Sequence, residues 1–126
     1  MGRLVNFYPA SIGKAERHLE VSELKMIRAA QASQKKLADY LAALHECEEA
    51  EERVDEATDT DTENLPEWKA DHEAKEARML ALRAEHAELM SAEDKADKVE
   101  DEAHERLETL EDEYEAHKKR RKTATF

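Results

Sequence analysis

Turn-forming residues are scarce in this sequence. Its 126 residues include only two glycines, Gly2 and Gly13, and two prolines, Pro9 and Pro66. A fold with many turns needs more of both, because these residues supply the backbone conformations at which a chain reverses. Neither glycine has a companion at the spacing of a phosphate-binding loop. The composition therefore argues against a compact enzyme with a cleft and against nucleotide-dependent catalysis.

Cysteine and long apolar runs are scarce as well. Cys47 is the only cysteine, which excludes a disulfide within one chain and fits a reducing compartment. No apolar run approaches the roughly 20 residues of a membrane-spanning helix. The opening MGRLVNFYPASIGK lacks the apolar centre of a secretory signal. We therefore expect no membrane partner and no secretion by a signal peptide, and an intracellular or virion-associated protein.

Charge and alanine dominate what is present. Charged residues account for 41% of the chain, the net charge is −12, and alanine supplies much of the 40% that is apolar. A chain rich in Ala, Glu, Lys, Leu and Arg is typical of long helices and coiled coils. At this length the chain has room for one domain at most.

The first half of the chain predicts one long helix. Residues 1–10 carry apolar side chains and stop at Pro9, so we expect an extended apolar arm there. Ser11 is a candidate N-cap for a helix over 11–57. Apolar or small residues recur there mostly at gaps of three, four or seven, which is helical spacing. These residues are Ile12, Ala15, Leu19, Ile27, Ala30, Leu37, Leu41, Leu44, Val54 and Ala57.

The second half predicts a turn and another helix. TDTDTENLP is rich in Thr and Asp, so we expect an acidic turn over 58–65. Asn64 can cap a helix over 66–120 whose first turn tolerates Pro66, and a basic and apolar tail follows over 121–126. The predicted seam of this helix alternates gaps of three and four: Trp68, His72, Lys75, Met79, Leu82, His86, Leu89, Glu93, Ala96, Glu100, Ala103, Leu107, Leu110, Tyr114 and His117.

Charge favours an all-α, coiled-coil-like antiparallel hairpin. Residues 1–45 carry seven basic and four acidic groups, whereas residues 46–117 carry eight basic and 28 acidic groups. Folding near Asp61 brings the basic side chains of the first helix beside the acidic part of the second. A parallel dimer would instead place the acidic segment 46–63 against its own copy, which is unfavourable.

The hairpin seam holds few bulky side chains. The leucines expected there are Leu37, Leu41, Leu44, Leu82, Leu89, Leu107 and Leu110. Long helices gain most of their stability from packing an apolar face, and the other seam positions are Ala, Glu, Lys or His. The sequence thus predicts either pairing with a second copy into a four-helix bundle or packing against a larger protein partner.

The histidines do not form a recognisable metal motif. His45-Glu46, His72-Glu73 and His104-Glu105 each lack the second histidine of the zinc-protease spacing. Asp101-x-x-His104 comes nearest to a di-iron motif, and the first helix offers no partner pair for it. Cys47 lies two residues from His45, off its helix face. We expect ordinary seam or surface histidines and no metal site.

The acidic turn resembles the start of a calcium-binding loop. Asp59, Asp61 and Glu63 occupy its first, third and fifth positions. The sixth position needs Gly and holds Asn64, and the twelfth needs Glu and holds Ala70. We therefore expect no calcium sensor and no cofactor.

Five consecutive basic residues, 118–122, lie four residues before the last position of the sequence. They allow four interpretations: offset of the helix dipole, with Glu115 four residues before Lys119; docking on an acidic protein; contact with nucleic-acid phosphate; or a nuclear-import patch. The adjoining acidic helix would repel phosphate. Candidate partner-binding residues are Leu4, Val5, Phe7 and Tyr8 of the arm and Lys118, Lys119, Arg120, Arg121, Lys122 and Phe126 of the tail.

The composition is similar to that of small acidic helical proteins of large particles, such as viral scaffolding or minor virion proteins and accessory subunits of complexes. We expect a non-enzymatic structural or assembly protein that braces or spaces components of a larger particle and attaches through its termini. The alternative is a dimeric nucleic-acid-associated regulator whose basic tail contacts phosphate. A third class, a metal enzyme in a dimeric bundle, would carry bound metal in stoichiometric amount.

Overall fold

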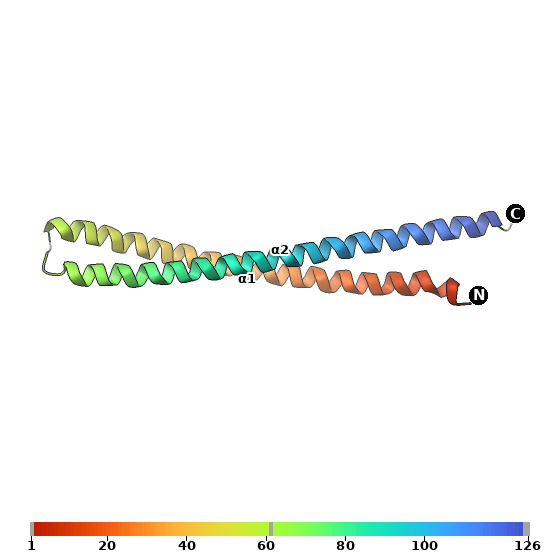
Figure 1. Ribbon diagram of the computed structural model, residues 1–126, viewed down its shortest axis with the longest axis horizontal. Coiled ribbons are helices and arrows are strands. Elements are labelled where there is room, and N and C mark those ends of the chain that lie inside the picture. Colours follow the sequence, from red (N-terminus) through yellow and green to blue (C-terminus); the bar gives the residue numbers. More distant parts are fainter. Residues whose placement is uncertain (1, 61, 125–126) are drawn as a thin grey trace. The chain divides into compact units, whose positions relative to one another are not determined.

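The protein consists of two long helices. The computed structural model describes the backbone of residues 2–60 and 62–124 and the side chains of 8–60 and 62–121. Helix α1 runs Gly2–Thr60 and helix α2 runs Leu65–Ala124 (Figure 1). Within the described residues there is no strand. The prediction of an all-α chain with two long helices and a short connection is confirmed.

The chain divides into two compact units, and each unit contains part of both helices. The turn unit is Ala29–Glu93, and the terminal unit comprises Met1–Arg28 with Asp94–Phe126. In Figure 1 the two helical segments of each unit lie side by side and run in opposite directions. Each unit is therefore an antiparallel helix pair.

Contacts in the turn unit follow the pairing expected from a fold-back near residue 61. Arg53 lies over the Trp68 ring, 5.8 Å from its centroid. Farther from the turn, Lys36 Nζ forms a salt bridge of 3.0 Å with Glu85 Oε2. This pair is one of the basic-to-acidic contacts between helices that the charge distribution predicts. The aliphatic part of a lysine side chain can cover apolar surface while the ammonium group reaches solvent.

The prediction of an extended arm over residues 1–10 is wrong. From Gly2 these residues belong to α1, and Pro9 lies inside the helix. Proline removes one backbone hydrogen bond, but its fixed φ of about −65° suits a helix. The preceding residue, Tyr8, packs against α2, with its ring centroid 5.8 Å from that of Tyr114. Ser11, predicted as the N-cap, is consequently in the interior of α1.

The turn is shorter than predicted, because both helices extend into it. Helix α1 ends at Thr60, and residues 62–64 form the described part of the turn. The Asn64 carbonyl accepts the first helical hydrogen bond of α2, from the Trp68 N–H at 3.1 Å. This places Asn64 at the N-cap, as expected, and puts Pro66 in the first turn, where its missing N–H costs no bond.

The C-terminal end of α2 also differs from the prediction. Helix α2 continues to Ala124, so residues 121–124 of the predicted tail are helical. Residues 125–126 lie outside the described part of the chain.

Small residues fill the seam between the helices. The buried side chains are Ala15, Leu19, Ser22, Ser33, Ala43, Cys47, Ala50, Ala57, Ala103 and Leu110. In α1 every seventh residue from 15 to 57 is Ala or Ser, apart from Lys36. A heptad position filled with small side chains lets two helix axes approach closely. Ser22 adds no unpaired group, because its hydroxyl donates to the His18 carbonyl at 2.8 Å.

The predicted seam is right for α2 and out of phase in the middle of α1. Leu110 is buried, and Leu44, Leu82, Leu89 and Leu107 are half-buried. Leu37 and Leu41 are exposed by 38% and 52%, so their assignment to the seam is wrong. Lys36 and Tyr40, one residue earlier, face the seam instead. The longest apolar side chains suggested one face, whereas the heptad of alanines determines another.

Spin labels at positions 25 and 97 should report the antiparallel pairing of the terminal unit. We expect them within roughly 20 Å, because packed helix axes lie about 8–10 Å apart. A single continuous helix would separate them by about 110 Å. Double electron–electron resonance on the labelled chain measures this distance, and a value near the longer figure would contradict the fold.

Substitutions on the two faces of α1 should differ in how much they change stability. Ala50 is 1% exposed, so Ala50→Leu should overpack the seam and lower the free energy of unfolding by about 1–3 kcal/mol. Leu41→Ala on the outside of the monomer should change it by no more than about 0.5 kcal/mol. Urea unfolding followed by circular dichroism, at a concentration where the chain is monomeric, measures both. A larger loss of unfolding free energy for Leu41→Ala than for Ala50→Leu would show that the assigned seam face of α1 is wrong.

Candidate functional site

Tyr8 of α1 and Lys118 of α2, two of the predicted partner-binding residues, make contacts within the terminal unit. Tyr8 packs against His117 at 5.5 Å between ring centroids as well as against Tyr114. Lys118 Nζ lies 4.1 Å from the centroid of the Tyr114 ring and 3.8 Å from Glu115 Oε1. The structure thus assigns Tyr8 and Lys118 to an aromatic and cationic cluster between α1 and α2. Cation–ring contacts of this kind stabilise by about 0.5–1 kcal/mol at exposed sites.

The remaining predicted partner-binding residues receive little structural definition. Lys119, Arg120 and Arg121 are exposed but interact with other groups of the chain. The side chains of Leu4, Val5, Phe7 and Lys122 lie outside the described residues, as does Phe126. Attachment through the termini therefore stays a prediction.

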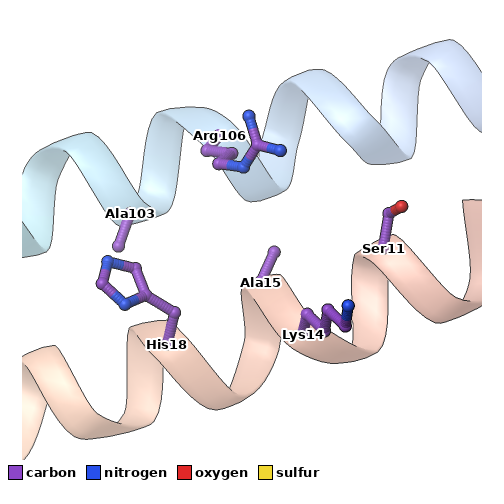
Figure 2. Close-up of a pocket in the computed structure, with 6 residues that line it drawn as sticks. All are labelled: Ser11, Lys14, Ala15, His18, Ala103 and Arg106. Atoms are coloured by element: carbon purple, nitrogen blue, oxygen red, sulfur yellow. The ribbon is translucent and has the colours of Figure 1, made fainter.

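A shallow groove opens between the helices of the terminal unit. It has a volume of about 380 Å³ and is lined by Ser11, Lys14, Ala15, His18, Ala103 and Arg106. Figure 2 shows Ala15 and Ala103 on the facing sides of the two helices, with the longer polar side chains around them. The small alanines create the space. Lys14 and Arg106 give the groove a positive character, without a carboxylate that could serve as a general base among its lining residues.

A cluster of three ionisable side chains lies nearby in the terminal unit. Glu23 of α1 and Glu100 and His104 of α2 place one ligand atom each within 4.8 Å of one another. His104 Nε2 is 3.6 Å from Glu100 Oε1 and 3.8 Å from Glu23 Oε1. The sequence pattern pointed to Asp101 as the partner of His104, whereas the structure places Glu100, four residues before it, in contact with the imidazole. The contribution of Glu23 depends on the pairing of the helices, which no local motif shows.

The other histidine and turn motifs show no such convergence. His45 Nε2 contacts Glu49 Oε1 at 3.0 Å along the exposed side of α1. Asp59 and Glu63 of the acidic turn are exposed, and Asp61 lies outside the described residues. Among the described residues neither motif brings three metal-binding groups together.

Cys47 is a buried thiol of the turn unit. It occupies the seam and is 7% exposed. Burial, followed by the negative charges of Glu76, Glu51 and Glu48, raises the pKa of the Cys47 thiol above its ordinary value. Because the thiolate is the nucleophile, this environment suppresses reactivity at neutral pH. The thiol therefore behaves as a packing residue.

Large apolar side chains lie on the outside of the helix pairs. In the turn unit Leu37, Leu41, Leu80 and Met90 are each between 38% and 52% exposed. Leu37 and Leu41 recur at helical spacing with the half-buried Leu44, so the three share one face, which we call the leucine face. The terminal unit exposes Val21, Leu24, Ile27 and Val99. The two helices thus bury small residues on each other and leave larger ones outside.

The chain matches no protein-family model, and searches of curated proteins and of solved structures found no significant match. Within the described residues, neither helix has a segment apolar enough over sufficient length to span a bilayer.

Alkylation of Cys47 should test the buried thiol. We expect native protein to react with iodoacetamide more slowly than urea-unfolded protein at pH 7.5, because burial lowers both access and the thiolate fraction. The native rate should rise as pH increases beyond the ordinary thiol range. Because the folded pKa is raised, the stability that depends on the neutral thiol is present at lower pH and is lost at alkaline pH. Equal rates for native and unfolded protein would contradict burial of the thiol.

Proposed function

We propose that this chain is a non-enzymatic structural or assembly protein that braces components of a larger intracellular or virion particle. The proposal rests on which apolar side chains are buried: small ones lie in the seam, and larger ones are exposed outside it. The seam holds Ala43, Cys47 and Ala50, while Leu37 and Leu41 are left outside. Exposed apolar patches of this kind mark protein–protein contacts.

The first partner we propose is a second copy of the chain, forming a four-helix bundle through the turn unit. Helix α2 offers an exposed stripe of small residues: Ala70, Ala74, Ala77, Ala81 and Ala84. Leucines of one copy can pack onto the alanines of the other. If each α1 contacts the partner's α2, the contact is made twice around a two-fold axis and the assembly closes.

Charge supports this arrangement. Residues 29–45 of α1 carry two lysines and one aspartate, a net charge of +1. Residues 65–93 of α2 carry seven acidic and four basic residues, a net charge of −3. Placing α1 of one copy on α2 of the other pairs opposite charges, whereas α2 on α2 would oppose two acidic surfaces.

The alternative of a nucleic-acid-associated regulator has less support. It requires a basic segment free to contact phosphate. Lys118 is engaged with Tyr114 and Glu115, and its basic neighbours also interact within the chain. Phosphate binding would still reveal itself by an affinity that falls steeply as salt concentration rises.

Sedimentation equilibrium of the purified full-length chain tests the bundle. We expect a dimer for the natural sequence and for Val99→Gln, a matched loss of an exposed apolar residue in the terminal unit. The double variant Leu37→Gln, Leu41→Gln should be monomeric at the same concentration, with at least about a tenfold weaker association, equivalent to about 1.4 kcal/mol. Circular dichroism verifies that its helices persist.

A monomeric natural protein at high concentration would contradict self-association. Sedimentation of a native lysate through a density gradient at moderate and high salt then tests the wider role. Migration of the chain with a large particle at both salts is expected. A small species whose position changes on nuclease treatment at moderate salt would favour the regulator instead.

A further inference from the structure

We propose that Glu23, Glu100 and His104 form a binding site for a divalent transition-metal ion of the zinc class, which joins α1 to α2 in the terminal unit. This site goes beyond the assembly role and does not depend on self-association. It also departs from the sequence-based expectation of no metal site, because one of its ligands comes from the other helix.

The ligand types suit such an ion. Imidazole nitrogen and carboxylate oxygen are both common zinc ligands, at about 2.0–2.2 Å from the metal. Glu100 and His104 are four residues apart, so they project from the same face of α2. Glu23 approaches from α1, with its Oε1 atom 3.8 Å from His104 Nε2. Three protein ligands and one water complete a tetrahedral shell.

The distances also suit a shared ion better than direct hydrogen bonds. The two separations from His104 Nε2, 3.6 Å and 3.8 Å, exceed the hydrogen-bond range of about 2.7–3.2 Å. Two ligands of a tetrahedral zinc ion lie about 3.3–3.6 Å apart, given metal–ligand bonds of about 2.0–2.2 Å. Small side-chain rotations would therefore bring the three atoms onto one ion.

Glu100 supplies an independent reason to expect a ligand. Its side chain is 16% exposed, and its Oε2 atom is buried and has no hydrogen-bond partner. A carboxylate oxygen withdrawn from water without a partner is unfavourable. Coordination of a cation by Oε1 of the same carboxylate would offset the negative charge that this oxygen shares.

The ion would act as a reversible cross-link between two helices whose seam here is thin. Ala15 and Ala103 face each other near the site across the groove of Figure 2, where little bulky surface is buried. A ligand that binds the folded state alone stabilises it in proportion to the logarithm of its concentration over its Kd. Zinc would thereby tighten the terminal unit without touching the turn unit.

Isothermal titration calorimetry with zinc chloride on the metal-free, full-length chain tests the site. We expect one ion to bind per chain. Glu23→Gln and His104→Gln should each weaken binding by at least about tenfold. The matched control is His45→Gln, which removes a histidine that also contacts a glutamate four residues away but has no third ligand from the other helix. Its affinity should stay within a factor of about two of the natural protein.

Thermal unfolding provides a second measurement. Zinc should raise the Tm of the natural chain and of His45→Gln, and should raise it less in Glu23→Gln and His104→Gln. Circular dichroism without metal verifies that all four proteins are folded. The proposal is overturned if zinc does not bind, if Glu23→Gln or His104→Gln binds it as well as the natural chain, or if His45→Gln weakens it equally. None of these outcomes bears on dimerisation of the metal-free protein, which sedimentation equilibrium tests separately.

Discussion

Close packing of small side chains along the seam is the interaction on which the rest of the structure depends. Alanine and serine recur at one heptad position of α1, and α2 contributes Ala103 and Leu110 to the buried set. Small side chains allow close approach of the backbones, yet each contributes little apolar area. A buried methyl or methylene group is worth about 0.8 kcal/mol, so many turns are needed to accumulate a stable interface. The length of the helices is therefore part of how they are held together.

The same seam determines what remains on the outside. Leucines that would form the core of an ordinary bundle are rotated away from the partner helix by the phase of the alanine heptad. Leu41, half exposed, illustrates this, since Tyr40 takes the place beside the seam. In the described part of the turn unit, Leu37 and Leu41 consequently stay exposed on the outside of the helix pair. This feature links the fold to the proposed role in assembly.

The candidate metal site arises from the combination of both helices. Glu100 and His104 are neighbours on one face of α2, but Glu23 joins them only because the terminal segments run antiparallel. The spacing within α2 could have been found by considering a gap of four residues instead of three. The third ligand could not, because its position depends on the register between helices. Tyr8 is a comparable case: its aromatic character suggested an exposed anchor, whereas pairing brings it to Tyr114 and His117.

The sequence by itself determined the number of helices, the site of the turn and the direction of the pairing. Few glycines and prolines, an Asn–Leu–Pro start after an acidic turn, and the uneven charge of the two halves were sufficient, because these are local or summed properties. It also showed the seam of α2, where gaps of three and four alternate without a break from Trp68 to His117. Tertiary structure decided the phase of α1 between about residues 22 and 44 and the continuation of the helix through Pro9. The phase depends on how closely a second helix can approach, which favours alanine over leucine at the contact. The helix through Pro9 lies beside the contact of Tyr8 with Tyr114, and neither feature can be read from one helix alone.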